Sequence, residues 1–116
     1  MIAKVCTIAQ KDGIKRDLAV SQSRIGEALV VLGNHQGALA AFRLSHAISE
    51  ALALRDPANS EWQLDLIVSF VKLSEVTNDK VYAEKALDLA VGMRQRGILA
   101  PRDAWMIEEL TQRLGR

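Results

Sequence analysis

The chain has 116 residues, of which 49% are hydrophobic and 25% charged, and 15 basic side chains nearly balance 14 acidic ones. These proportions are ordinary for one globular domain and exclude a disordered chain, and a net charge of +1 provides no overall attraction to nucleic acid or an anionic membrane. No apolar run approaches the roughly 18 residues of a membrane-spanning helix, and we expect no secretory leader and no membrane partner. Because Cys6 is the single cysteine, no internal disulfide can form, and a cytoplasmic protein is expected.

The N-terminal third predicts a short helix followed by a long one. Residues 2–10 have the helical spacing of apolar positions, and Asp12-Gly13 is expected to end that segment. A second helix is expected over residues 15–32, where apolar positions recur at three and four and form one stripe. That stripe consists of Leu18, Ile25, Leu29 and Leu32.

A third helix is expected to pair with the second as a hairpin. Gly33 suits the left-handed conformation at the end of the second helix, and Asn34 suits the N-cap of a helix over residues 35–55. Asp56-Pro57 should end that helix, because proline lacks an N–H group and disfavours helix in the residue before it.

A second hairpin and a final helix complete the predicted elements. One helix is expected over residues 61–77, where Ser60 and Gln63 have the form of a capping box, and another over residues 80–96. The final helix, over residues 101–114, has an apolar face with which it can cover the open side of the second hairpin. We therefore expect it to act as a C-terminal cap.

Part of the sequence occurs twice. The segment Asp17-Leu18-Ala19-Val20-Ser21 returns as Asp65-Leu66-Ile67-Val68-Ser69, a shift of 48 positions from 17 to 65. A period of this length is typical of stacked helical units, none of which can bury its apolar face alone. The sequence therefore predicts an all-α, solenoid-like array.

The first unit resembles a tetratricopeptide repeat. The positions that carry the resemblance are Ile25-Gly26, Leu29, Gly33, Ala38 and Phe42, followed by Asp56-Pro57 in the place of the closing proline. The chain is similar to a long-period bacterial variant of that family over about residues 14–99. The second unit is degenerate, because Ser74 and Thr77 stand where Gly26 and Leu29 stood. The family's tryptophan position holds Gln22 in the first unit and Phe70 in the second.

The resemblance implies a right-handed α-α superhelix of stacked antiparallel helix hairpins, in one domain over residues 1–116. Its expected parts are a partial N-terminal helix (2–12), a first repeat (14–58), a degenerate second repeat (60–99) and the capping helix (101–114). The family binds proteins on a concave surface lined by the first helix of each repeat. The implied function is a protein-protein interaction module, an adaptor or scaffold that is either free-standing or the C-terminal part of a larger repeat protein.

The groove predicted from the resemblance combines apolar and charged side chains. Its expected members are Val20, Ser23, Arg24, Glu27, Val31, Val68, Val71, Lys72 and Glu75. Clustered exposed valines favour a protein or peptide partner. The charges have a simpler interpretation, as pairs within one helix, Arg24 with Glu27 and Lys72 with Glu75, which contribute about 0.2–0.5 kcal/mol each.

No catalytic, cofactor-binding or metal-ligating motif is found, so we expect a protein that is not an enzyme and that holds no cofactor or metal. His35 and His46 are eleven positions apart on one predicted helix, about 16 Å at 1.5 Å per residue, and cannot share an ion. Cys6 is expected to be a small core residue. Trp62 and Trp105 are expected to anchor the core at repeat junctions.

Two further expectations concern partners. The first repeat has no cover on its N-terminal side, so we expect a homo-oligomer that associates through residues 2–32. The alternative function is a regulatory helical domain that contacts nucleic acid. Its basic residues would be Lys11, Lys15, Arg16 and Arg24. Asp12 and Asp17 are interspersed among them and disfavour nucleic acid as a partner.

Overall fold

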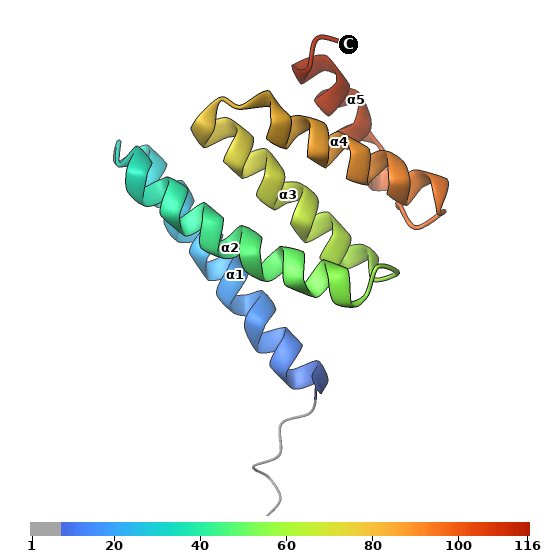
Figure 1. The fold of residues 1–116 in the computed structure, drawn as a ribbon, viewed down its shortest axis with the longest axis horizontal. Coiled ribbons are helices and arrows are strands. Elements are labelled where there is room, and N and C mark those ends of the chain that lie inside the picture. Colours follow the sequence, from blue (N-terminus) through green and yellow to red (C-terminus); the bar gives the residue numbers. More distant parts are fainter. Residues whose placement is uncertain (1–7) are drawn as a thin grey trace, which may run out of the picture.

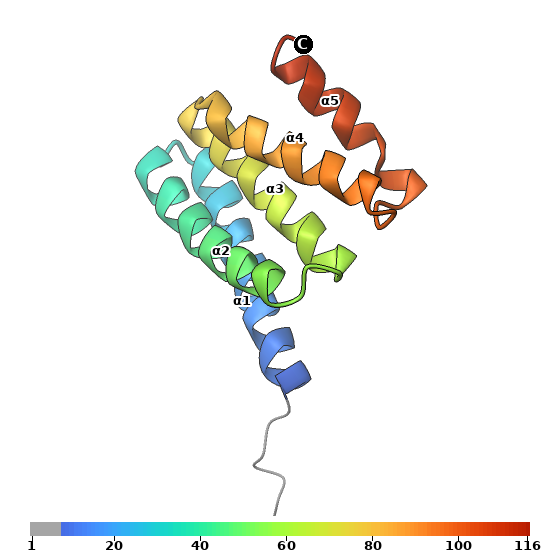
Figure 2. The same cartoon turned by 45° about the vertical axis from the view of Figure 1, so that its right-hand side comes forward.

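The computed structural model describes residues 8–116, and its elements are helical. In chain order they are α1 (Ile8–Val31), α2 (His35–Arg55), α3 (Ser60–Thr77), α4 (Lys80–Gln95), the 3-10 turn η2 (Pro101–Asp103) and α5 (Trp105–Arg113). Each α-helix packs against the next in sequence, so the hairpins α1–α2 and α3–α4 and the short α5 form a stacked array (Figures 1 and 2). The predicted all-α architecture is confirmed.

α1 differs from the prediction, because Asp12-Gly13 does not interrupt it. The helix runs unbroken from Ile8 to Val31, and Gly13 has helical backbone. Asp12 is buried and pairs with Arg55 at the end of α2. A carboxylate with a partner on the neighbouring helix does not compete for its own backbone, so the local breaker signal is overridden. The remainder of the predicted N-terminal helix, including Cys6, lies outside the described residues.

The turns within the two hairpins match the sequence signals. Gly33 has a left-handed φ of 82°, and the side chain of Asn34 accepts a hydrogen bond of 2.9 Å from the backbone N–H of Gly37. Between α3 and α4, Asn78 has a left-handed φ of 58°. Both hairpins therefore close through a residue that tolerates positive φ.

The start of α3 differs from the predicted capping box. Asn59, not Ser60, is the N-cap, and its side chain accepts a hydrogen bond of 3.1 Å from the N–H of Trp62. The side chain of Gln63 is buried and donates from Nε2 to the carbonyl oxygen of Ala53 in α2, at 3.0 Å. Gln63 thus joins the two hairpins instead of capping its own helix.

The main apolar core lies in the second hairpin and α5. Its buried members are Ala53, Leu66, Ile67, Phe70, Ala83, Ala86, Leu87, Ala90, Met93 and Leu110. A smaller cluster of Ala38, Phe42 and Leu73 joins α2 to α3. Because Leu110 of α5 is part of the main cluster, α5 covers the second hairpin as the predicted cap does.

The apolar stripe of α1 is not part of this core. Its exposed members are Leu18, Ile25 and Leu32. α1 instead packs through small residues, Ala19 and Gly26, both of which are buried. A Cβ atom on Gly26 would lie only 2.5 Å from the ring of Phe42, so the close approach of α1 to α2 depends on this glycine. Three of the four apolar residues of the stripe consequently face away from the core, whereas the fourth, Leu29, packs against the smaller cluster.

Candidate functional site

Three hollows with shared walls run over α1, α3 and α5. Their volumes are about 180, 300 and 270 Å³. The first and second share Glu27, the second and third share Lys72 and Glu75, and the first and third share Val68. We call this set of hollows the groove.

The groove contains eight of the nine residues predicted for it. They are Val20, Ser23, Arg24, Glu27, Val68, Val71, Lys72 and Glu75. Val31 is not among them, because it lies exposed at the last position of α1 and lines none of the three hollows. The structure thus brings the first helices of both predicted repeats to one surface.

α5 supplies a wall of the groove that the sequence did not predict. Trp105, Met106, Glu109 and Arg113 line the third hollow. Trp105 is an exposed residue, which corrects its expected place in the core. A signal was available in the sequence, because Trp105, Glu109 and Arg113 follow one another at four-residue steps and therefore share one face with charged residues.

The floor of the first hollow is rich in hydroxyl groups. Ser45, Ser49 and Ser69 are buried residues that line it, together with Asp65. These polar residues were also not predicted for the groove. They come from α2 and α3, so the first hollow lies where the two hairpins meet.

Ion pairs cross the groove from helix to helix. Lys72 of α3 lies 3.5 Å from Glu27 of α1, and Arg113 of α5 lies 3.5 Å from Glu75 of α3. The interpretation of these charges as pairs within one helix is therefore wrong for both predicted pairs, since Arg24 has no ion-pair partner among residues 8–116. Most of the groove's charges already have partners, so they orient the walls relative to one another.

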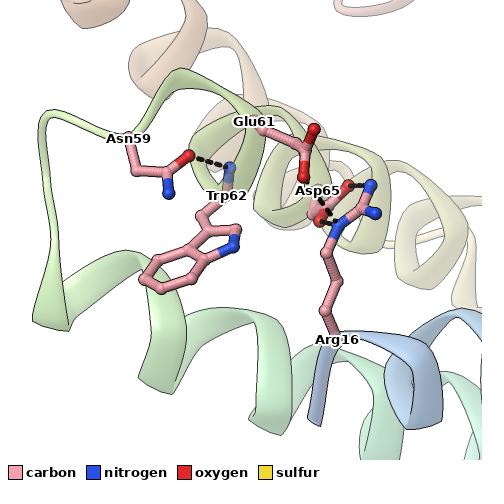
Figure 3. A network of polar contacts seen from close by, with 5 residues as sticks. All are labelled: Arg16, Asn59, Glu61, Trp62 and Asp65. Atoms are coloured by element: carbon pink, nitrogen blue, oxygen red, sulfur yellow. Dashed lines mark hydrogen bonds and ion pairs between the residues drawn. The ribbon is translucent and has the colours of Figure 1, made fainter. Parts of the chain in front are cut away.

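Arg16 makes a further bridge from α1 to α3 (Figure 3). Its Nε donates to Oδ2 of Asp65 at 2.7 Å and its Nη2 to Oδ1 at 3.3 Å, and Glu61 lies 3.3 Å from the same Nε. The hydrogen bond to Asp65 raises the pKa of Arg16, against the effect of burial. The positive charge of Arg16 is therefore paired with carboxylates of α3. This pairing weakens the alternative interpretation of α1 as a nucleic-acid-binding surface.

A serine, a histidine and a glutamate lie in line between α2 and α3. His46 Nδ1 is 2.8 Å from Ser69 Oγ, and His46 Nε2 is 3.6 Å from Glu50 Oε2. These residue types form hydrolase triads, but Ser69 Oγ also lies 2.7 Å from the carbonyl oxygen of Leu66, which can only accept. The hydroxyl therefore donates to Leu66 and accepts from Nδ1–H. With no proton to give to the imidazole, Ser69 is not an activated nucleophile.

His46 serves as a link between the helices. Its ring lies 4.6 Å from that of Phe70, measured between centroids. Burial lowers the pKa of His46, while Glu50 raises it and Lys85 lowers it further. Within residues 8–116, no group of three His, Cys, Asp or Glu side chains is arranged to hold a metal ion.

None of the described helices is both long enough and apolar enough to cross a membrane. Comparisons with protein-family models, with curated proteins and with solved structures found no match for this chain.

Proposed function

We propose that this chain is a protein-protein interaction module of the tetratricopeptide type, a cytoplasmic adaptor or scaffold that holds a peptide segment of a partner protein in the groove. The observation that carries the proposal is the shared lining of the three hollows across α1, α3 and α5. An extended surface of this kind suits a chain-like ligand better than a compact one.

The chemistry of the groove defines the kind of peptide it would take. Val20, Val68, Val71 and Trp105 provide apolar contact, and ion pairs lie between them. Each hollow has several times the roughly 30 Å³ that one water occupies, so each can admit an apolar side chain. Because Lys72 and Arg113 already have carboxylate partners, a strongly acidic peptide gains little from them. We expect peptides with spaced apolar side chains and mixed charge.

Selection from a displayed library of random peptides tests this function. Peptides selected on the wild-type chain should bind a Val20→Asp/Val71→Asp double variant at least about tenfold more weakly, because each substitution places a charge in one hollow. Val81→Asp is the matched control, since Val81 is an exposed valine of α4 that lines none of the three hollows. Equal binding to all three proteins would refute a groove ligand, as would failure to select any peptide.

Self-association, the other partnership expected from the sequence, would use a different part of the molecule. The relevant surface is the exposed side of α1, which lies outside the main core cluster.

A further inference from the structure

The exposed side of α1 carries a regular seam. It consists of Ile14, Leu18, Ser21, Ile25 and Ala28, all exposed, at successive steps of four, three, four and three residues. Its three large members are 63%, 51% and 48% exposed for Ile14, Leu18 and Ile25. Steps of this kind keep a narrow apolar line on one side of a helix and are typical of helices that pack side by side in coiled coils. We call this line the α1 seam.

We propose that the α1 seam packs antiparallel against the α1 seam of a second copy of the chain, forming a dimer with two-fold symmetry. The charges beside the seam favour this occupant. Asp17 and Arg24 lie seven positions apart, two helical turns, and therefore on the same flank. Neither takes part in an ion pair among residues 8–116.

Two-fold symmetry turns these two charges into complementary partners. In an antiparallel pair, Asp17 of each copy faces Arg24 of the other, which gives two ion pairs related by the symmetry axis. In a parallel pair the same flank would meet Gln22 and Leu29 of the second copy, with no opposite charge. The charge pattern therefore selects the antiparallel arrangement.

The same arrangement also determines which residues of the two seams pack against each other. When Asp17 lies beside Arg24 of the second copy, Leu18 of one copy faces Ser21 of the other, and Ile14 faces Ile25. In each facing pair the two residue numbers add to 39. In these layers Leu18 has a small residue opposite it, as interdigitating packing requires. The two ion pairs and the packing of the seam thus agree on one register.

The α1 seam is narrow, which limits the affinity of the proposed dimer. A helix of 24 residues is about 36 Å long, and a pair of such helices buries less than the roughly 800 Å² per partner of a standard interface. We therefore expect dissociation constants on the order of micromolar. Leu44 and Leu54 of α2 are also exposed, and either would strengthen the dimer if it reached the second copy.

Analytical ultracentrifugation of the whole chain, from about 1 to 100 µM, tests the dimer and its register. Asp17→Arg and Arg24→Asp each place like charges opposite one another, and each should weaken dimerisation at least tenfold. The double variant, Asp17→Arg/Arg24→Asp, restores both ion pairs with their signs exchanged and should return to within about threefold of wild type. The readout needs no peptide, so it is independent of the proposed groove ligand.

Two further variants separate the seam from general effects of surface charge. Ile25→Glu should give a monomer at every concentration. Val81→Glu, at an α4 valine that is 49% exposed, should dimerise as wild type does. A wild-type chain that is monomeric at 100 µM would overturn the proposal and leave the seam to a different chain. Failure of the double variant to recover, or equal loss in Val81→Glu, would also overturn it.

Discussion

One five-residue pattern occupies two different environments in α1 and α3. Leu66 of α3 is 8% exposed and belongs to the main core, whereas Leu18, at the same place in the pattern, is 51% exposed. Ser69 is buried and bonded to His46, whereas Ser21 is exposed. Leucine and serine are identical in the two segments, although Ala19 corresponds to Ile67, so the difference at these two positions comes from the helices around them.

The difference lies in the number of neighbours. α3 packs between α2 and α4, whereas α1 packs mainly on α2. α1 is attached to the rest of the fold by small residues, by Leu29, which packs against the smaller cluster, and by ion pairs such as Arg16 with Asp65. Within residues 8–116, one side of α1 is therefore left uncovered, whereas α3 is covered on both sides.

The largest difference is expected between alanine substitutions at the two equivalent leucines. Leu66→Ala should lower the free energy of unfolding by about 2–5 kcal/mol, because it leaves a cavity in the main core. Leu18→Ala should cost less than about 1 kcal/mol in the monomer, because Leu18 remains largely solvated. Urea unfolding followed by circular dichroism, at a concentration where the chain is monomeric, measures both. Equal costs would contradict the difference in environment.

Two glycines of α1 provide a second comparison, with effects of opposite sign. Gly26→Ala should destabilise the fold by about 1–3 kcal/mol, because the added Cβ would lie against the ring of Phe42. At Gly13 no atom lies within 4 Å of an added Cβ, so Gly13→Ala should stabilise α1 by about 0.5–1 kcal/mol through helix propensity. Thermal unfolding of the two variants gives both signs. Stabilisation by Gly26→Ala would show that α1 and α2 are not in close contact there.

Substitution of two arginines of α1 compares the side of the helix that contacts α3, where Arg16 lies, with the exposed side, where Arg24 lies. Arg16→Ala removes the paired hydrogen bonds to Asp65 and should cost about 1 kcal/mol. Arg24→Ala should change monomer stability by less than about 0.5 kcal/mol, because Arg24 has no ion-pair partner within residues 8–116. Hydrogen exchange should report faster opening of α1 in the first variant alone. Comparable exchange in both would argue against the bridge in Figure 3.

The smallest effect is expected from pH, at the link between the hairpins. Burial lowers the pKa of His46 in the folded chain, so near pH 6.5 and below, the unfolded chain binds more protons. Stability should therefore be higher above pH 6.5 and should fall as the pH drops toward the folded-state pKa. His46→Gln should flatten this dependence, and Glu50→Gln should steepen it, because Glu50 supports the charged ring. Melting temperatures between pH 7.5 and 5 test both slopes.

Local signals in the sequence were sufficient to place most helix ends. Gly33 and Asn34 ended α1 and began α2 as predicted, because a positive φ and a side-chain cap are properties of a few adjacent residues. The two local predictions that were wrong, the helix break at Asp12-Gly13 and the capping box at Ser60, involve side chains that interact with residues distant in the sequence. Asp12 forms an ion pair with Arg55 and does not end a helix, and Gln63 donates a hydrogen bond to the carbonyl oxygen of Ala53 and does not cap its own helix.

The groove, likewise, was predicted in part from the sequence. The resemblance to a repeat family implied which faces of the first helices share a surface, and eight of the nine residues named on that basis line the three hollows. The part contributed by α5 was not predicted, because no earlier segment repeats it and a tryptophan on an apolar helix face indicates a core position. Likewise, exposure of the α1 seam depends on which helices stack beside it, which periodicity does not specify.

Disulfide cross-linking between engineered cysteines in the α1 seam is the most direct test of whether the seam packs against that of a second copy of the chain. In a Cys6→Ser background, chains carrying Leu18→Cys are mixed with chains carrying Ser21→Cys in a glutathione redox buffer. The proposed register places these positions opposite one another, so a covalent heterodimer should form in the mixture and exceed the product of either chain alone. No covalent dimer, or an equal yield when Leu18→Cys is mixed instead with Ala28→Cys, would contradict the account.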